Sequence, residues 1–223
     1  MKIKGAIFDM DGTIMDSLIF WDYLWQRIGE RYMADASFRP DDEVNKKVRT
    51  MIFLDAMTYF KSYYRLSGET EELLRFTSNG ICDFYRDVAK PKTGAKALLE
   101  HLKAQNIPIC LASATAMSEL RYALECHGFS QYFDVVLSCA DIGVGKERPD
   151  IYLKALDLMN LSQNEVCVFE DSYVALETAK KAGFQTVGIF DQYNFEQERV
   201  RNASDIYLDE QTSLDRLIPL IHA

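Results

Sequence analysis

Short apolar runs and amphipathic stretches alternate along much of the chain. The apolar runs predict strands buried on both faces of a sheet, over residues 3–8, 107–112, 134–138, 166–169 and 185–190. Helical spacing of apolar residues follows over residues 94–105, 115–127, 149–159 and 172–182. Glycine follows two of these helices, at Gly128 and Gly183, where a helix commonly ends. The alternation predicts an α/β fold with a doubly wound parallel sheet.

Residues 16–88 break this alternation and are helical in pattern throughout. The predicted helices cover residues 17–33, 40–49, 51–65 and 69–87. Of the chain's 27 aromatic residues, 14 fall in this segment, and these 14 include both tryptophans. A small helical bundle needs bulky side chains to form a core, although one aromatic, such as Trp21, could instead face a ligand.

These patterns predict two domains. Residues 1–15 and 89–223 form the α/β core, and residues 16–88 form an inserted helical cap domain. In doubly wound sheets the ligand lies beyond the carboxyl ends of the strands. A helical domain inserted directly after the first strand would cover that edge as a lid, so the residues just after each strand are the candidates for chemistry.

Composition and charge exclude several classes of partner. With 48% hydrophobic and 26% charged residues, the chain has the composition of an ordinary globular protein. Its net charge of −9 argues against nucleic acid or an anionic membrane as a partner, since both need a basic surface. No apolar stretch approaches the roughly 18 residues that a membrane-spanning helix needs. We expect a monomer or a weak homodimer.

The cysteines indicate a reducing compartment. There are five, without a CxxC pair, which is neither a disulfide framework nor a zinc site. Cys110, Cys139 and Cys167 lie in apolar runs, where a reduced cysteine behaves as a small hydrophobe. Asp9 and Asp11 interrupt the first apolar run too early for a signal peptide. We therefore expect a cytoplasmic protein.

Two aspartates follow the first predicted strand. Asp9 and Asp11 stand two residues apart just past the strand, before Gly12, which allows a sharp turn and close approach to a ligand. One carboxylate could attack an electrophile while the other transfers a proton. The alternative is an ordinary Asx-rich turn. With only three histidines in the chain, neither a Ser-His-Asp triad nor a histidine zinc site has support.

A second acidic pair follows the strand at residues 166–169. Glu170 and Asp171 would crowd negative charge at the same edge, and a hard divalent cation such as Mg²⁺ would offset that cost. The alternative is that Asp171 or Ser172 caps the next helix.

Two further positions could hold an anion. Ser113 and Ala114 follow the strand at residues 107–112 and lead into a helix, where N–H groups bind anions. Lys146 lies in a glycine-containing loop after the strand at residues 134–138, and a lysine there can neutralise phosphate and restrain carboxylates. The alternatives are a helix cap and a surface lysine.

In chain order, these four sites resemble the motifs of the haloacid dehalogenase superfamily. The motifs are FDMDGT, the serine, GKxxPDIY from Gly145 to Tyr152, and FEDS. The resemblance covers the whole chain and is strongest to the branch with a helical cap that contains β-phosphoglucomutases and sugar-phosphate phosphatases. Glu147 replaces a common proline and Ala175 a common glycine, and neither substitution removes a catalytic group.

The resemblance implies a role for each matching residue. Asp9 would be the nucleophile that forms an aspartyl-phosphate, Asp11 the general acid and base, and Lys146 a catalytic residue that also contacts phosphate. Mg²⁺ would be held by the Asp9 carboxylate, the Asp11 backbone carbonyl and Asp171, with Glu170 as a direct or water-mediated ligand. The implied phosphate-binding residues are Gly12, Thr13, Ser113, Ala114 and Lys146.

The reaction implied is Mg²⁺-dependent hydrolysis of a small phosphorylated metabolite, with a sugar phosphate expected. A phosphomutase is the alternative, but β-phosphoglucomutases carry a cap histidine where this chain has Trp21. A non-catalytic ligand-binding or regulatory protein on the same fold is the alternative of another class. Arg49, near Lys46 and Lys47, is the candidate for a substrate's distal anion, unless these residues form a solvated helix face.

Overall fold

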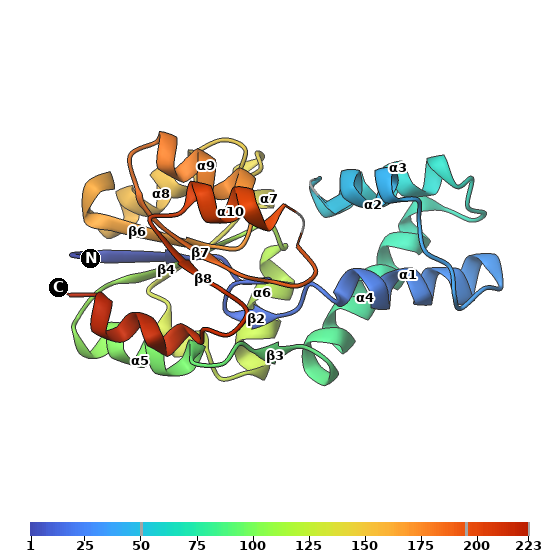
Figure 1. Cartoon of the computed structure of the whole chain (residues 1–223). Helices are drawn as coiled ribbons and strands as arrows, with labels where there is room; N and C mark the ends of the chain where they lie inside the picture. Colours follow the sequence, from blue (N-terminus) through green and yellow to red (C-terminus); the bar gives the residue numbers. More distant parts are fainter. Residues whose placement is uncertain (50, 195, 223) are drawn as a thin grey trace. The chain divides into compact units, whose positions relative to one another are not determined.

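The computed structural model describes residues 1–49, 51–194 and 196–222. The chain divides into two compact units. Unit 1 consists of Met1–Leu18 and Lys90–Ala223, and unit 2 of Ile19–Ala89. Unit 2 is thus an insertion in the sequence of unit 1 (Figure 1). The assignment of residues 16–88 as a cap domain stays a prediction.

Unit 1 is built on a parallel sheet. Within the described residues the sheet has six strands, in the order β5-β4-β1-β6-β7-β8. The strands are β1 (Gly5–Phe8), β4 (Ile109–Ser113), β5 (Val135–Ser138), β6 (Val166–Glu170), β7 (Gln185–Ile189) and β8 (Ile206–Leu208). All neighbouring pairs run parallel. The predicted doubly wound α/β fold is confirmed.

Helices cover both faces of this sheet (Figure 1). They are α5 (Ala95–Ala104), α6 (Met117–Cys126), α7 (Cys139–Ile142), α8 (Asp150–Met159), α9 (Tyr173–Lys181) and α10 (Gln197–Ala203). Helices α8, α9 and α10 lie on one side, and α5 lies on the other with the 3-10 segment Leu214–Leu220. Gly128 and Gly183 follow α6 and α9 with φ of 67° and 92°, as expected of glycines that end helices.

The strand order creates a crevice at the carboxyl ends of β1 and β6. From β1 the chain continues to β4 and β5 on one side, whereas from β6 it continues to β7 and β8 on the other. The connections therefore leave these two adjacent strands in opposite directions, which opens the edge of the sheet between them. This edge carries the residues that follow β1 and β6.

Strand β8 and helices α7 and α10 are among the elements that were not predicted. Strand β8 is only three residues long, too short to show a period. Helix α10 has the polar sequence QERVRNA and buries only Val200 and Ala203. Helix α6 begins at Met117, two residues later than predicted, because Ala116 is extended, with ψ of 150°.

Unit 2 is helical in each of the four predicted segments. Its helices are α1 (Phe20–Ile28), α2 (Asp42–Arg49), α3 (Phe53–Tyr63) and α4 (Thr70–Asp87), and a π-helical turn (Gly29–Met33) continues α1. The centre of its core is Trp25, whose ring stacks on Phe60 with centroids 4.7 Å apart. The indole N–H of Trp25 donates to Asn45 Oδ1 at 3.1 Å. Trp21 packs against this core while keeping partial exposure.

A two-stranded antiparallel ribbon brackets the insertion. Strand β2 (Met15–Asp16) pairs with β3 (Lys90–Pro91), with Met15 opposite Pro91. The chain thus leaves and re-enters unit 1 at one place.

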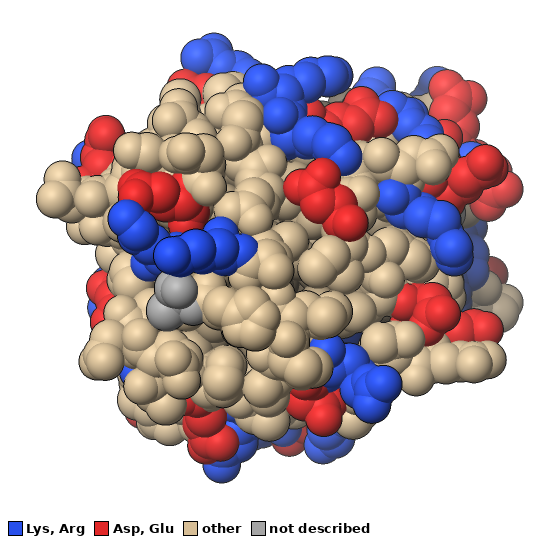
Figure 2. Space-filling view, turned by 60° about the vertical axis from the view of Figure 1, so that its left-hand side comes forward, with Lys and Arg blue, Asp and Glu red and all other residues tan. Residues whose placement is uncertain are grey.

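The surface charges, the helix hydropathy and the cysteines can be compared with what the composition predicts. On the face shown in Figure 2, acidic and basic side chains are interspersed. In the part of the chain that the structure describes, no helix is both long and apolar enough to span a membrane. All five cysteines are free thiols, and Cys110, Cys139 and Cys167 are buried as predicted.

Trp25→Ala should destabilise unit 2. Removing a fully buried, stacked indole leaves a cavity and costs about 3–5 kcal/mol. The measurement is denaturant unfolding followed by circular dichroism. Trp21→Ala is the matched control, one helical turn away and partly exposed, and should cost less. Equal losses for the two variants would contradict the packing described here.

Candidate active site

The pairing of β1 with β6 sets Asp9 beside Glu170. Phe8 lies opposite Phe169 in the ladder, and their rings stack with centroids 4.1 Å apart. The Asp9 N–H continues the ladder by donating to the Phe169 carbonyl at 3.0 Å. The next residue of each strand, Asp9 and Glu170, therefore reaches the same edge of the sheet.

Lys146 joins these two carboxylates. Its ammonium group, on a side chain that is 11% exposed, donates to Asp9 Oδ1 and to Glu170 Oε1. The other oxygen of Glu170 accepts the Ser172 N–H at 3.2 Å, and the Tyr152 hydroxyl donates to Oε1 at 3.4 Å. The loop after β5 thus brings a cation to carboxylates from two other strands.

Asp171 completes an acidic cluster. Asp9, Glu170 and Asp171 are buried, and each offers a carboxylate oxygen within 4.8 Å of the others. Thr13 Oγ1 donates to Asp171 Oδ1 at 3.2 Å, and Asn194 Nδ2 donates to Oδ2 at 2.7 Å. Helix α9 has Ser172 as its N-cap without a side-chain capping bond. Ser172, one of the two residues considered for the cap, thus occupies the cap position, but its side chain does not bond the helix N-terminus.

Burial and crowding perturb the cluster's ionisation. Burial raises the pKa of Asp9 to about 8; Lys146 opposes the rise, and Glu170 and Asp11 add to it. The pKa of Asp171 is also raised well above its usual value, by burial first and then by Glu170 and Asp9. Burial alone would lower the pKa of Lys146, but the two carboxylates hold it well above its usual value. A cation at this cluster would favour the ionised carboxylates.

The close approach of the backbone to Asp171 requires a glycine at position 12. Its φ of 82° is in the left-handed region, and a Cβ added there would lie 2.5 Å from Asp171 Oδ2. The backbone after Asp9 can approach Asp171 only because residue 12 has no side chain.

The Asp11 carboxylate has hydrogen-bond partners outside the acidic cluster. Its Oδ1 accepts the Ser17 hydroxyl at 2.7 Å, and its Oδ2 accepts the Thr115 hydroxyl at 2.8 Å. Asp11 contributes no side-chain oxygen to the cluster of Asp9, Glu170 and Asp171. The two aspartates of the first motif thus have different surroundings, a condition for different chemical roles.

Ser113 and Thr115 connect β4 to Asp11. Ser113 is the buried last residue of β4, and its Oγ accepts the Thr115 N–H at 3.1 Å. Ser138, at the end of β5, donates its hydroxyl to the Thr115 carbonyl at 2.7 Å. Ala114 is exposed at the same turn.

A model of haloacid dehalogenase-like hydrolases matches residues 3–183. The chain belongs to this family. The match includes each of the four motifs, so the resemblance found in the sequence is confirmed, as is the prediction of a hydrolase.

Relatives and solved structures add detail to this family membership. The chain is 25% identical over 185 residues to a phosphorylated carbohydrates phosphatase of Thermotoga maritima, covering 83% of this chain and 84% of that protein. It is 26% identical over 202 residues to a β-phosphoglucomutase of Bacillus subtilis, covering 84% and 83%. CbbY from Rhodobacter sphaeroides, solved in complex with phosphate, has a TM-score of 0.80 at 19% identity over 96% of both chains, which shows the fold.

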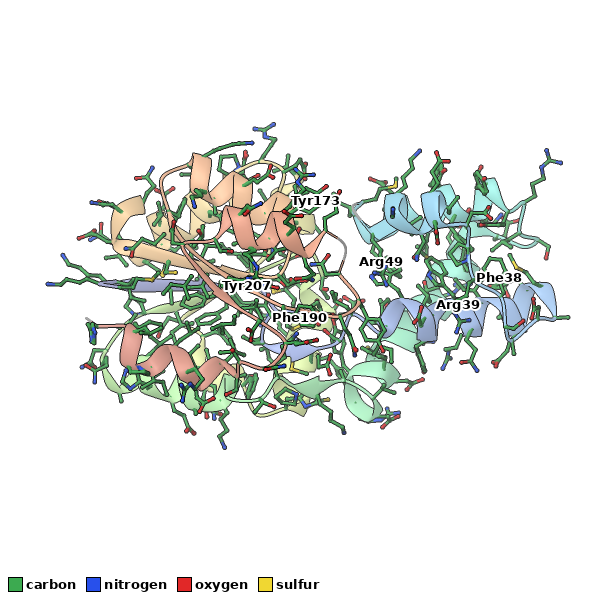
Figure 3. All side chains as sticks on the ribbon, in the orientation of Figure 1. Phe38, Arg39, Arg49, Tyr173, Phe190 and Tyr207 are labelled. Atoms are coloured by element: carbon green, nitrogen blue, oxygen red, sulfur yellow. The ribbon has the colours of Figure 1, made fainter. Side chains whose placement is uncertain are left out.

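Two predicted site residues of this hydrolase have contacts that the sequence did not indicate. Thr13, predicted to bind phosphate, is fully buried and donates its hydroxyl to Asp171. Arg49 belongs to α2 of unit 2 and is partly buried, with its guanidinium 5.7 Å from the centre of the Trp21 ring (Figure 3). Neighbouring Lys46 and Lys47 are exposed, so the solvated helix face fits them better than Arg49.

Sequence reasoning missed two contributors near Asp171. Asp191 lies two residues after the end of β7 and is buried in an ion pair with Lys92, at 2.9 Å. Asn194 lies three residues further on. The rule applied to four strands, that chemistry follows the carboxyl end, would have identified this loop if extended to the strand at residues 185–190.

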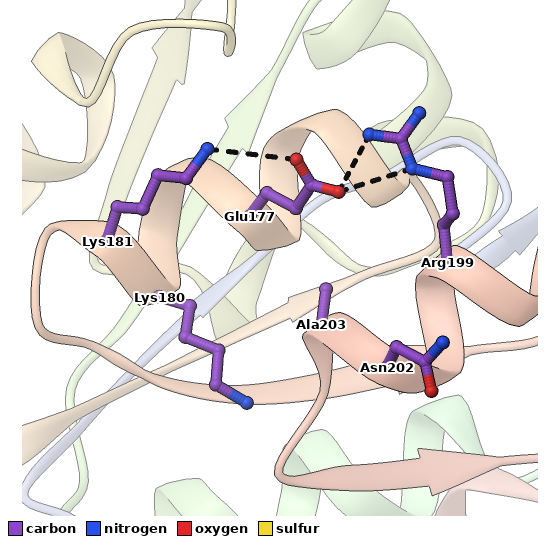
Figure 4. Close-up of a pocket in the computed structure, with 6 residues that line it drawn as sticks. All are labelled: Glu177, Lys180, Lys181, Arg199, Asn202 and Ala203. Carbon is purple, nitrogen blue, oxygen red and sulfur yellow. Dashed lines mark hydrogen bonds and ion pairs between the residues drawn. The ribbon is translucent and has the colours of Figure 1, made fainter.

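A shallow pocket between α9 and α10 is unrelated to this site. Figure 4 shows its lining, which consists of Glu177, Lys180, Lys181, Arg199, Asn202 and Ala203. Glu177 pairs with Arg199 at 2.8 Å and with Lys181 at 3.8 Å. Lys180 pairs with Asp205 at 3.1 Å. Lys180 and Lys181 lie at the end of α9 remote from Asp171, whereas Arg199 of α10 lies over the Tyr173 ring at 3.7 Å. Each of the three cations pairs with a carboxylate.

The raised pKa of Asp9 predicts a pH-dependent stability in the metal-free protein. A carboxyl group whose pKa rises on folding binds its proton more tightly in the folded state. Its contribution to the free energy of unfolding therefore falls as the pH rises from 3.8 to about 8. Asp9→Asn has no such titration, so its stability relative to wild type should increase with pH.

The measurement is denaturant unfolding of both proteins in EDTA at about pH 5 and about pH 8. The difference between variant and wild type cancels the titrating groups that do not interact with Asp9. A difference that is the same at both pH values would contradict the raised pKa.

Proposed function

We propose that this hydrolase is a Mg²⁺-dependent phosphatase of a small phosphorylated metabolite, with a sugar phosphate expected, acting through an aspartyl-phosphate on Asp9. The observation that carries this proposal is the buried cluster of Asp9, Glu170 and Asp171 with Lys146 at the carboxyl edge of β1 and β6. Family membership and the phosphatase relative support the reaction class.

Asp9 is the proposed nucleophile. One of its carboxylate oxygens forms a bond to phosphorus while the bond from phosphorus to the substrate's ester oxygen breaks. Water then attacks the same phosphorus, and the bond from Asp9 to phosphorus breaks to release phosphate. Lys146 supports the charged form of Asp9 and offsets negative charge as the phosphoryl group moves.

Asp11 is the proposed general acid and base. It protonates the leaving alkoxide in the first step and takes a proton from the attacking water in the second. The Ser17 and Thr115 hydroxyls donate to its two oxygens, which fixes the carboxyl group. Its separation from the acidic cluster favours proton transfer over metal binding by its side chain.

The acidic cluster fits a magnesium ion. Clustered carboxylate oxygens are hard donors of the kind that Mg²⁺ takes, and Asp9, Glu170 and Asp171 offer three within 4.8 Å. The proposed ligands are the Asp9 and Asp171 carboxylates and the Asp11 carbonyl, with Glu170 as a direct or water-mediated partner. When bound, the ion supplies positive charge that stabilises the phosphoryl oxygens.

The phosphoryl group's remaining oxygens are assigned to the turns after β1 and β4. Ala114 offers a backbone N–H group, and Ser113 offers a hydroxyl. The Gly12 N–H already donates to the Met15 carbonyl at 2.9 Å, so the turn after β1 is assigned the N–H groups around Gly12. A hydroxyl that accepts one hydrogen bond, as Ser113 does from Thr115, can still donate its own proton. Arg49 of unit 2 remains the proposed contact for a distal anion.

A phosphomutase is the second candidate, because a β-phosphoglucomutase is among the relatives. Trp21 stands where the family resemblance implies the cap histidine of β-phosphoglucomutases, which favours hydrolysis. A phosphate-release screen over sugar phosphates, nucleotides and phosphoglycolate with Mg²⁺ distinguishes the two. Conversion of a hexose 1-phosphate that depends on glucose 1,6-bisphosphate would support the mutase, and binding without turnover would support a regulatory protein.

Activity should require Mg²⁺ and be inhibited by Ca²⁺. Calcium takes more oxygen ligands in looser geometry, so it would misplace Asp9 relative to phosphorus. Phosphate release is measured in EDTA, with Mg²⁺ restored, and with Ca²⁺ added to the Mg²⁺ enzyme. Equal turnover in EDTA would refute the metal assignment.

Asp9→Asn should abolish turnover while the protein stays folded. The variant loses the nucleophile but also one negative charge from the crowded edge, so its stability is at least retained. Phosphate release and circular dichroism are measured together. Activity above about a tenth of wild type, well beyond what loss of a covalent nucleophile allows, would show that another group attacks.

Asp11→Asn should separate the two steps. Turnover should fall by about 10²–10⁴-fold, the usual contribution of general acid–base catalysis. The loss should be smaller for p-nitrophenyl phosphate, whose leaving group needs little protonation. A burst of p-nitrophenol ahead of free phosphate is expected, because dephosphorylation lacks its base. Equal losses for all substrates, without a burst, would exclude Asp11 from this role.

A further inference from the structure

Asn194 contacts Asp171 at two points. Its side-chain Nδ2 donates to the Asp171 backbone carbonyl at 2.6 Å and to carboxylate Oδ2 at 2.7 Å. Thr13 donates to the other carboxylate oxygen, Oδ1, at 3.2 Å. Each oxygen of the Asp171 carboxylate therefore accepts a side-chain hydrogen bond, and these bonds come from opposite ends of the core sequence.

A tight turn after β7 places Asn194. The Asn194 N–H donates to the Asp191 carbonyl at 3.0 Å, and the Tyr193 N–H donates to Asp191 Oδ1 at 2.9 Å. Gln197 at the start of α10 also donates to the Asp191 carbonyl, at 2.8 Å. Such an Asx turn fixes the backbone between residues 191 and 194.

A buried ion pair anchors this turn. Asp191 is 2% exposed, and its Oδ2 accepts the Lys92 ammonium at 2.9 Å. The same ammonium donates to the carbonyl of Phe190, labelled in Figure 3, at 2.8 Å. Lys92 directly follows β3. Its position is fixed because its backbone N–H donates to the Ile14 carbonyl at 2.9 Å. The first motif and the turn after β7 are thus joined through Lys92.

The chemistry of the amide suits a site that binds a cation. The Asn194 amide carries no net charge, so it can orient a carboxylate without offsetting the negative charge that attracts the metal. An ammonium group at the same place would compete with the metal. Partners that orient a ligand in this way usually contribute strongly to metal affinity.

We propose that Asn194 is a positioning residue that orients Asp171 for Mg²⁺, and that the Lys92–Asp191 ion pair holds it in place. This inference rests on the proposed function, since it needs the cluster of Asp9, Glu170 and Asp171 to bind the metal. It adds the loop after β7 to the four motifs as a fifth contributor to the site.

The test is a Mg²⁺ titration of the substrate-free protein by calorimetry, with the Mg²⁺-induced shift in melting temperature as a second readout. Asn194→Ala should weaken Mg²⁺ binding by about 10–100-fold. The position is partly exposed, so the variant should fold. Asn194→Leu, which branches at Cγ as asparagine does, loses the same donors and should weaken binding equally. Asn202→Ala, at an exposed position on α10, is the matched control and should bind Mg²⁺ as wild type does.

Activity assays separate positioning from a general structural role. For Asn194→Ala, the Mg²⁺ concentration that gives half-maximal activity should rise, while kcat at saturating Mg²⁺ stays close to wild type. Wild-type Mg²⁺ affinity in both Asn194 variants would overturn this inference and leave the proposed function intact. A wild-type protein that binds no Mg²⁺ would overturn the metal assignment together with the inference.

Discussion

The Lys146 ammonium group, held between Asp9 and Glu170, is the interaction on which the rest of the site depends. It comes from the loop after β5, and its two partners come from β1 and β6. Burying several carboxylates at one sheet edge is unfavourable unless cations offset them. Lys146 contacts two of the three members of the cluster, and the remaining charge makes this edge a place for a divalent cation and a phosphoryl group.

Asp9 and Asp11 look alike in the sequence but have different surroundings in the fold. Asp9 lies among carboxylates and an ammonium group, whereas Asp11, two residues later, lies between the hydroxyls of Ser17 and Thr115. Gly12 makes the turn directly after them possible, because any side chain there would meet Asp171. Nucleophile and proton donor can thus be close in the chain and still have different surroundings, as different roles require.

Much of this site could be predicted from the sequence, because parallel strands bring their carboxyl ends to one edge. Asp9, Ser113, Lys146 and Glu170 were candidates by that rule, and the family resemblance supplied their expected roles. The pattern could not show which way each side chain turns, so the contact of Thr13 with Asp171 was missed. Lys92 was missed as well, since its partner Asp191 lies 99 residues away and no local pattern encodes such a pairing.

The account's central claim is that Asp9 becomes phosphorylated during turnover, and trapping that intermediate tests it most directly. The enzyme is mixed with Mg²⁺ and p-nitrophenyl phosphate, quenched, and treated with borohydride, which reduces an acyl phosphate to an alcohol. Peptide mass spectrometry should then find homoserine in place of Asp9, and only when substrate was present. Unmodified Asp9 in enzyme quenched during active turnover, or homoserine at another aspartate, would contradict the claim.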